Sequence, residues 1–365
     1  MGLIHGSQVA PFQQTVGDSA PQRRMALKKT DISKRFSRPL PVPGVFRLAV
    51  LLLGAFSAGP GAAATAAYPS KPIRMIIPFS PGGTSDTLAR ILGQKMTESW
   101  GQQIVVDSRP GASGIIGTEI AMRAPADGYT LMHGNMSQFA INPALYPRLN
   151  YETLRDFVPL TLVATAPQLL VVHPGVQAKT VRELTELARA KPGSLNFGSG
   201  GYGTLAFVGG EMFKSATGVN IVHISYKGTV LALNDLLGGQ VQILFSDMPI
   251  ALPHAKSGKL RALAVTGPQR TPLVPGMPTV AESGVPGYAL VNWWGIFAPR
   301  ATPQDIVAKL GAELARIHGL PDLRERYAGL GVDAASNTPG EFADYIKAEA
   351  ARYAKVLKDA GAKVE

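Results

Sequence analysis

The chain has 365 residues, enough for two domains of ordinary size. Hydrophobic residues make up 45% of it and charged residues 17%, which excludes an intrinsically disordered chain. It contains no cysteine, so disulfides, thiol nucleophiles and thiolate metal sites are excluded as well. The formal charge of +11 taken alone would suggest nucleic acid as a partner.

The positive charge is concentrated at the N-terminus. Residues 1–67 hold eight Lys and Arg residues against two Asp residues, and therefore +6 of the +11. This basic stretch is followed by the apolar run Leu48–Phe56 and by small residues that end at Ala67. Basic, apolar and small-residue segments in this order are typical of a secretory signal peptide, and the apolar run is too short to span a bilayer. We therefore expect an exported protein, cleaved near Ala67, that does not bind nucleic acid.

After residue 67, strand-like and helix-like segments alternate along the chain. The expected strands are Ile73–Phe79, Gln103–Asp107, Tyr129–His133, Leu195–Phe197, Ile221–Tyr226, Val241–Phe245, Leu260–Val265 and Tyr288–Phe297. The clearest helices are Asp86–Trp100 and those that begin after Thr180, Thr302 and Thr338. This alternation predicts an α/β fold with largely parallel sheets and helices on their faces.

Two long extended stretches interrupt the alternation, at residues 157–174 and 288–299. A chain needs two such stretches to leave one α/β domain, build another and return. We therefore predict a discontinuous first domain, residues 68–168 plus 290–365, and an inserted second domain, residues 169–289. A cleft between two such lobes is a common place for a small ligand.

The first glycine-rich turn, residues 78–86, links an expected strand to an expected helix. Glycine lets the backbone approach a ligand closely, and the N-terminus of a helix offers free N–H groups and the positive end of its dipole. Thr84 and Ser85 add hydroxyl donors, and we expect Ser85 or Asp86 to cap the helix. The turn therefore predicts an anion-binding loop.

A second glycine-rich turn, residues 196–204, also lies between strand and helix. It matches G-x-G-x-x-G through Gly198, Gly200 and Gly203, but the next strand, Ile221–Tyr226, carries no carboxylate for a ribose. The motifs of a P-loop and of a nucleophile elbow are missing too. The remaining interpretation is a second anion cradle, on the second domain.

Other polar segments are less specific. Residues 134–143 are rich in neutral hydrogen-bond donors, and Lys227, at the end of a strand, either attracts an anion or is solvated. No two histidines after residue 67 have metal-ligand spacing, and His223 is expected to be buried and hydrogen-bonded. Of Trp293 and Trp294, one ring is expected in the core and the other at the cleft wall. We predict no metal and no cofactor.

Over essentially the whole chain after residue 67, these motifs resemble the Bug-type periplasmic solute-binding proteins of tripartite tricarboxylate transporters. The resemblance rests on Pro78–Asp86, Ser108–Gly114, Pro125–Leu131, Ala140–Tyr146, Gly198–Gly201, Tyr226–Gly228, Asn234–Gln240 and Pro278–Glu282. It implies a two-lobed periplasmic-binding-protein fold of type II-like architecture that closes on a small carboxylate. It also implies a periplasmic, monomeric protein that meets membrane transporter subunits transiently.

The resemblance and the glycine turns together predict the ligand-binding residues. They are Phe79, Ser80, Gly82, Gly83, Thr84, Ser85, Asp86, Asn135, Ser137, Asn142, Ser199, Gly200, Gly201, Gly203, Thr204, Tyr226, Lys227 and Asp247. The chain departs from the family pattern at Leu205–Phe207, where Ser and His are common, and at Ser246, which precedes Asp247. The apolar departure favours a ligand with an aromatic or aliphatic body over a polyacid. An exported α/β enzyme acting on a small organic acid through Ser199 or Asp86 is the alternative, but we see no catalytic constellation and no activating base.

Overall fold

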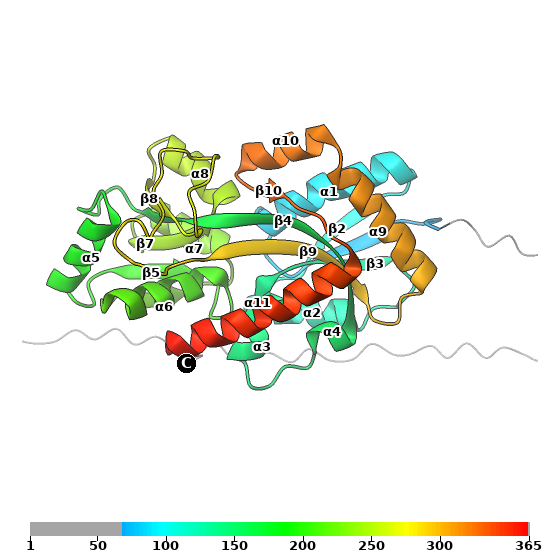
Figure 1. Cartoon of the computed structure of the whole chain (residues 1–365), viewed down its shortest axis with the longest axis horizontal. Helices are drawn as coiled ribbons and strands as arrows, with labels where there is room; N and C mark the ends of the chain where they lie inside the picture. Colours follow the sequence, from blue (N-terminus) through cyan, green and yellow to red (C-terminus); the bar gives the residue numbers. More distant parts are fainter. Residues whose placement is uncertain (1–67, 364–365) are drawn as a thin grey trace, which may run out of the picture. The chain divides into compact units, whose positions relative to one another are not determined.

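The computed structural model describes residues 68–363, in which strands and helices alternate (Figure 1). The signal peptide expected in residues 1–67 lies outside the described residues. The strands are β1 Ile73–Ile77, β2 Ile104–Ser108, β3 Thr130–Asn135, β4 Phe157–Val172, β5 Asn196–Ser199, β6 Val222–Ser225, β7 Ile243–Asp247, β8 Arg261–Val265, β9 Val291–Pro299 and β10 Asp333–Ala334. The α-helices are α1 Thr84–Trp100, α2 Ile115–Met122, α3 Asn142–Leu145, α4 Thr153–Asp156, α5 Val181–Ala190, α6 Leu205–Thr217, α7 Thr229–Leu237, α8 Met248–Lys256, α9 Gln304–His318, α10 Pro321–Leu330 and α11 Pro339–Asp359. Two short helical segments, η1 Ala112–Gly114 and η2 Ser137–Ile141, are the remaining elements.

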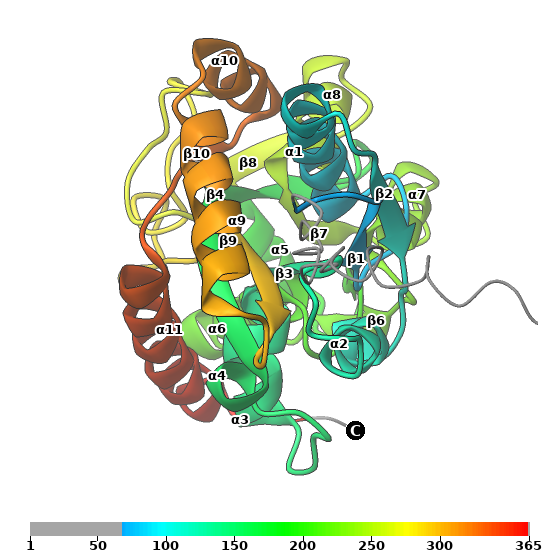
Figure 2. The same cartoon turned by 90° about the vertical axis from the view of Figure 1, so that its right-hand side faces the viewer.

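Two parallel triplets of strands form the centres of two lobes. In the first lobe β1 pairs in parallel with β2 and β3, and in the second lobe β5 pairs in parallel with β6 and β7. Strand β1, with the sequence IRMII, is apolar along nearly its whole length, as expected of a parallel strand covered on both faces. Figures 1 and 2 show α1, α9 and α10 around the first triplet, and Figure 1 shows α5 to α8 around the second. The predicted two-lobed α/β fold is confirmed.

Strands β4 and β9 connect the lobes and are antiparallel to each other (Figure 1). The first part of β4 pairs with β9 as far as Pro167, and from Gln168 onward the strand pairs with β7 instead. Proline cannot donate a hydrogen bond to a sheet, so Pro167 suits the point at which the partner changes. The predicted extended stretches at 157–174 and 288–299 are therefore the connection, while the exact domain boundaries at 168/169 and 289/290 remain a prediction.

The helices bury three apolar clusters against this framework. The cluster under α1, α9 and α10 contains Trp294, whereas the cluster under α6 and α11 contains Trp293. Both rings are fully buried, so the expectation that one of them would wall the cleft is wrong. Neighbouring side chains of a strand point to opposite faces of a sheet, which separates the two rings. Helix α11 packs along β4 and α3 and reaches α6 of the second lobe.

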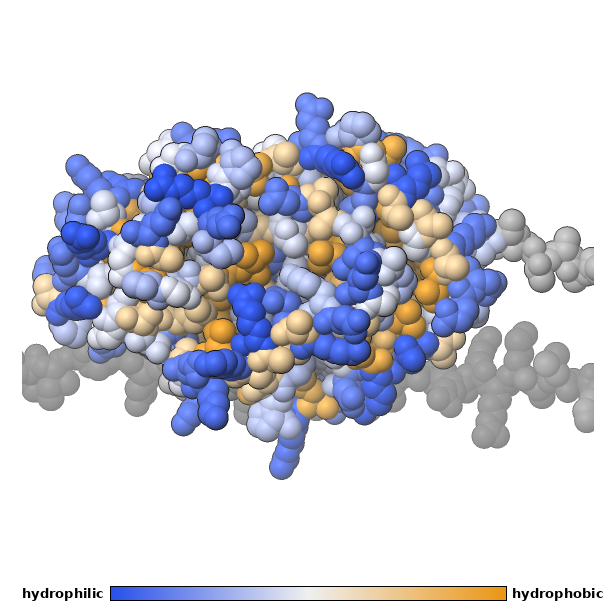
Figure 3. Space-filling view, in the orientation of Figure 1, coloured by the Kyte–Doolittle hydropathy of each residue, from blue (hydrophilic) through white to orange (hydrophobic). Residues whose placement is uncertain are grey.

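The surface is mixed in polarity. On the face seen in Figure 1, hydrophilic residues are spread over both lobes, with small hydrophobic patches between them (Figure 3). In the described part of the chain, no helix combines the length and the hydropathy needed to cross a bilayer.

Candidate functional site

The N-terminus of α1 forms one wall of a cavity between the lobes. Gly83 is the N-cap residue, with extended backbone angles and no side-chain capping bond, so the first N–H groups of this 17-residue helix are left without a capping side chain. The expectation that Ser85 or Asp86 caps the helix is wrong: Ser85 Oγ accepts from Trp294 Nε1, at 3.1 Å, and Asp86 accepts from the N–H of Gly82, at 3.0 Å. The N–H groups and the positive end of the helix dipole thus remain for another partner.

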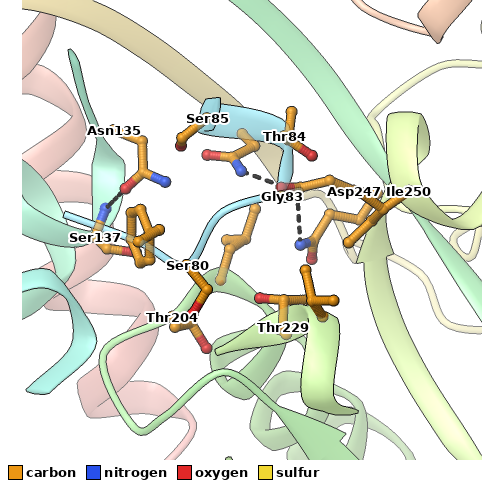
Figure 4. A pocket seen from close by; sticks show the side chains of 16 residues that line it. Ser80, Gly83, Thr84, Ser85, Asn135, Ser137, Thr204, Thr229, Asp247 and Ile250 are labelled. Atoms are coloured by element: carbon orange, nitrogen blue, oxygen red, sulfur yellow. Dashed lines mark hydrogen bonds between the residues drawn. The ribbon is translucent and has the colours of Figure 1, made fainter. Parts of the chain in front are cut away.

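The cavity is lined from both lobes and from the connecting strands (Figure 4). Its lining residues are Phe79, Ser80, Gly83, Thr84, Ser85, Asn135, Ser137, Gln168, Thr204, Leu205, Ala206, Thr229, Val230, Asp247, Ile250 and Asn292. The free space at its centre is about 50 Å³, room for about three to five water molecules. None of these lining residues is a lysine, an arginine or a histidine. An anion here would be held by neutral donors.

Hydroxyl and amide donors surround this space. Thr84 is only 4% exposed, and its Oγ1 has no hydrogen-bond partner among the described residues. Asn135 uses its side-chain oxygen to accept from the N–H of Ser137, at 2.9 Å, which leaves its NH₂ group free (Figure 4). A buried polar atom without a partner is costly, so Thr84 indicates a position at which a ligand supplies the missing contact.

A carboxylate lies on the opposite side of the cavity. Asp247 ends β7, and its Oδ1 accepts from Asn292 Nδ2, at 2.9 Å, and from Gln168 Nε2, at 3.1 Å (Figure 4). Burial raises the pKa of Asp247, and the two amides and the nearby Thr84 hydroxyl offset this only in part. No described cation forms an ion pair with Asp247.

Nine of the predicted ligand residues come together at this cavity. They are Phe79, Ser80, Gly83, Thr84, Ser85, Asn135, Ser137, Thr204 and Asp247. The sequence analysis missed Gln168, Asn292, Thr229, Val230 and Ile250, which also line it. Thr229 could have been found, because it ends the turn that contains Lys227. Gln168 and Asn292 lie inside long apolar strands and are buried, so no local pattern in the sequence marks them.

Most of the second glycine turn does not line the cavity. Gly200, Gly201, Tyr226 and Lys227 line a neighbouring cavity of about 490 Å³, which shares Phe79 and Ser80 with the first. At the boundary of the two, Ser80 Oγ donates to the carbonyl of Lys227 across the lobes, at 3.4 Å. Any direct binding role of these residues remains a prediction.

Gly203 brings the lobes into contact rather than lining either cavity. Its N–H donates to Ser113 Oγ of the first lobe, at 3.1 Å. A Cβ atom at Gly203 would overlap the side chain of Asn142, so only glycine permits this approach. Asn142, another predicted ligand residue, donates to the carbonyl of Ser113, at 3.1 Å, and thereby supports the same contact.

The remaining predicted residues make contacts within their own lobe. Gly82 and Asp86 bond to each other, and Asp86 also pairs with Arg90. Ser199 is fully buried and is joined to His223 Nε2 by a hydrogen bond of 2.7 Å. The expected hydrogen bond of His223 is therefore present, but the residue is half-buried, so the expectation that it is buried is wrong. Burial and the charge of Lys214 lower the pKa of His223 to about 4. This serine–histidine pair opens into neither cavity, so Ser199 has no route to a substrate there.

Comparison with known proteins identifies the family. Residues 88–362 match the tripartite tricarboxylate transporter family receptor. The chain belongs to this family. Protein BugT of Bordetella pertussis is 36% identical over 318 residues, which cover 86% of this chain and 98% of that protein. The resemblance to Bug-type solute-binding proteins is thereby confirmed.

Two solved structures are similar to this receptor over most of its length. The structure of R. palustris Rpa4515 with adipate has a TM-score of 0.80 at 35% identity and covers 81% of this chain and 100% of its own. The periplasmic binding protein BugD has a TM-score of 0.78 at 33% identity, covering 82% and 100%. The family is one of receptors, so the interpretation as a solute-binding protein is confirmed and the alternative of an exported enzyme is not supported.

Proposed function

We propose that this receptor binds one carboxylate group of a small organic acid in the cavity between its lobes and delivers the ligand to a tripartite tricarboxylate-type membrane transporter. The observation that carries the proposal is the uncapped N-terminus of α1 beside the unpartnered hydroxyl of Thr84. Free N–H groups at a helix N-terminus bind anions without any charged side chain. The adipate bound to the R. palustris relative supports the same ligand class.

The donors of this carboxylate site come from the first lobe. Ser80, Thr84 and Ser85 lie at or before the start of α1, while Asn135 ends β3 and Ser137 follows it. The second lobe supplies the opposite wall through Thr204, Thr229 and Asp247. We infer that the two units, residues 68–168 plus 290–365 and residues 169–289, close on the ligand about β4 and β9.

The apolar part of the lining concerns the rest of the ligand. Leu205 and Ala206 stand where Ser and His are common in the family pattern, and both line the cavity with Val230 and Ile250. These side chains offer no donor to a second or third carboxylate. We therefore propose an acid with an aliphatic or aromatic body in preference to a polyacid.

We also propose that the protein acts in the periplasm, as a monomer that meets the transporter only transiently. The expected signal peptide in residues 1–67 and the similarity to the periplasmic binding protein BugD support this location. A monomer suffices because both walls of the cavity come from one chain.

Isothermal titration of carboxylic acids into the protein tests the proposal when Thr84→Val is compared with the parent. Valine keeps the shape of threonine and removes the hydroxyl. Loss of a hydrogen bond to a charged ligand is expected to weaken binding about ten- to a hundredfold. Thr185→Val is the matched control, because Thr185 lies on α5 and its hydroxyl donates to its own helix.

Equal affinities of the parent and Thr84→Val would refute the placement of the carboxylate at α1. If no mono- or dicarboxylate binds the folded parent protein, the proposed ligand class itself fails.

A further inference from the structure

The wall opposite α1 is built from hydrogen-bond acceptors. Asp247 Oδ1 is occupied by the amides of Asn292 and Gln168, whereas no described residue donates to its Oδ2. Because a carboxylate only accepts, Gln168 must turn its NH₂ group toward Asp247 and its oxygen away. That oxygen, Gln168 Oε1, is buried and has no hydrogen-bond partner among the described residues. Both residues line the cavity, so it holds two acceptors that lack a donor among the described residues, with the Thr84 hydroxyl as the nearest donor to Asp247.

These acceptors do not match a ligand that consists only of carboxylate and hydrocarbon. A ligand carboxylate in the same small cavity as an ionised Asp247 would be repelled by it, because like charges in a medium of low dielectric constant interact strongly. Asp247 has no described cationic partner to offset this repulsion. Burial raises the pKa of Asp247, and the α8 N-terminus and the donors on Oδ1 offset this only in part, so a positive charge beside it would favour the ionised form. The missing positive charge is therefore left for the ligand to supply.

We propose that the ligand of this receptor carries an ammonium group close to its carboxylate, and that Asp247 and Gln168 accept hydrogen bonds from it. The proposal rests on the proposed function, since it places the carboxylate at the N-terminus of α1. An ammonium group supplies three donors and one positive charge, which satisfies both acceptors and balances Asp247. Together with the apolar wall at Leu205 and Ile250, this defines a zwitterionic amino acid with an apolar side chain.

Pairs of acids that differ only by a 2-ammonium group provide the test. We would titrate the protein, freed of bound ligand by unfolding and refolding, with L-leucine against 4-methylpentanoate, L-phenylalanine against 3-phenylpropionate, and L-aspartate against succinate. In at least one pair the amino acid is expected to bind about ten- to a hundredfold more tightly than its partner. This comparison needs no variant, so it does not depend on any substitution folding.

The variant Asp247→Asn then assigns the preference to a residue. It keeps the size of the side chain and removes the charge, so the amino acid is expected to lose at least tenfold in affinity while the plain acid loses none. Asp344→Asn is the matched control, because Asp344 is exposed on α11 and pairs only with Lys347.

Each result is decisive. An amino-acid preference that disappears in Asp247→Asn supports the proposal. A preference that survives in Asp247→Asn overturns the role of Asp247. If plain acids bind the parent protein as tightly as their amino acids, the ammonium site is overturned while the proposed carboxylate function stands. If neither member of any pair binds, both fail.

Discussion

Lowering the pH tests how the buried His133 of the first lobe affects the stability of the folded protein. This residue lies on β3, is fully buried, and has no hydrogen-bond partner on either ring nitrogen among the described residues. Burial is the main cause that lowers the pKa of His133 from 6.5 to about 4. The ring is therefore neutral in the folded protein at neutral pH. In the unfolded chain the same ring binds a proton once the pH falls below about 6.5.

The direction in which stability changes with pH follows from this difference in the pKa of His133 between the folded and the unfolded state. Between pH 6.5 and pH 4 the unfolded chain binds a proton at His133 that the folded protein does not, so stability falls as the pH falls. The difference between a pKa of 6.5 and one of about 4 corresponds to about 3 kcal/mol in total. Between pH 7 and pH 5 the loss is about 2 kcal/mol by the same linkage relation. Carboxylates lose most of their contribution below this range, so the interval from 7 to 5 isolates the histidines.

Urea unfolding at pH 7 and pH 5 measures this loss when the parent is compared with His133→Leu. Leucine has a similar size and leaves no unpartnered polar atoms, so the variant is expected to be at least as stable at pH 7. The variant should lose about 2 kcal/mol less unfolding free energy than the parent on going from pH 7 to pH 5. His254→Gln is the control, because the side chain of His254 makes no hydrogen bond with a described residue. An identical pH dependence of the parent and His133→Leu would refute the assignment.

Two further substitutions test contacts around the site, and a third tests the cap of a helix. The added methyl group of Gly203→Ala would overlap Asn142, so the lobes cannot close. Ligand affinity should therefore fall at least tenfold in titration calorimetry, with thermal stability retained. Unchanged affinity would contradict a role of the contact between Gly203 and the first lobe in closure. Trp294→Phe removes the donor to Ser85, so affinity for a carboxylate should change several-fold, with tryptophan fluorescence as the check on folding; an unaltered affinity would show that the bond does not orient Ser85. Thr338→Ala removes the capping box of α11 and should cost about 1 kcal/mol of unfolding free energy, measured by urea titration; no loss would show that the cap is dispensable.

Periodicity and turn chemistry were sufficient to predict the lobes. Strand β1 and helix α1 lie within a few residues of their expected bounds, because an apolar run followed by Pro, Gly and an amphipathic stretch has few alternatives. The long strand β4 was predicted as an extended connection for the same reason. Its exchange of partners at Pro167 depends on pairing with strands far away in the sequence, and local patterns do not determine it.

The residues of the site also fall into those that a local sequence pattern predicts and those that depend on distant contacts. Thr84 and Ser85 were predicted because a single turn places them at a helix N-terminus, whatever the rest of the fold does. Gln168 and Asn292 were missed, because each is a lone polar residue inside an apolar strand and gains its role only from Asp247, 79 and 45 residues away in the sequence. The cap was predicted wrongly because the helix begins at Thr84, so Gly83 is the N-cap residue and Ser85 and Asp86 lie within the first turn.

The contacts across the cleft explain why a ligand can control its closure. Away from the connecting strands, Ser80 donates to Lys227 and Gly203 donates to Ser113 across the cleft, whereas the bonds of Gln168 and Asn292 to Asp247 lie at β4 and β9. No ion pair joins the lobes among the described residues. The two neutral hydrogen bonds away from β4 and β9 contribute roughly 1–3 kcal/mol together, whereas reversing an open-to-closed ratio from 1:99 to 99:1 takes about 5.5 kcal/mol. A ligand bound between α1 and Asp247 contacts both lobes at once and can supply the difference. In the proposed function, closure would then report occupancy and would let a membrane transporter distinguish a loaded receptor from an empty one.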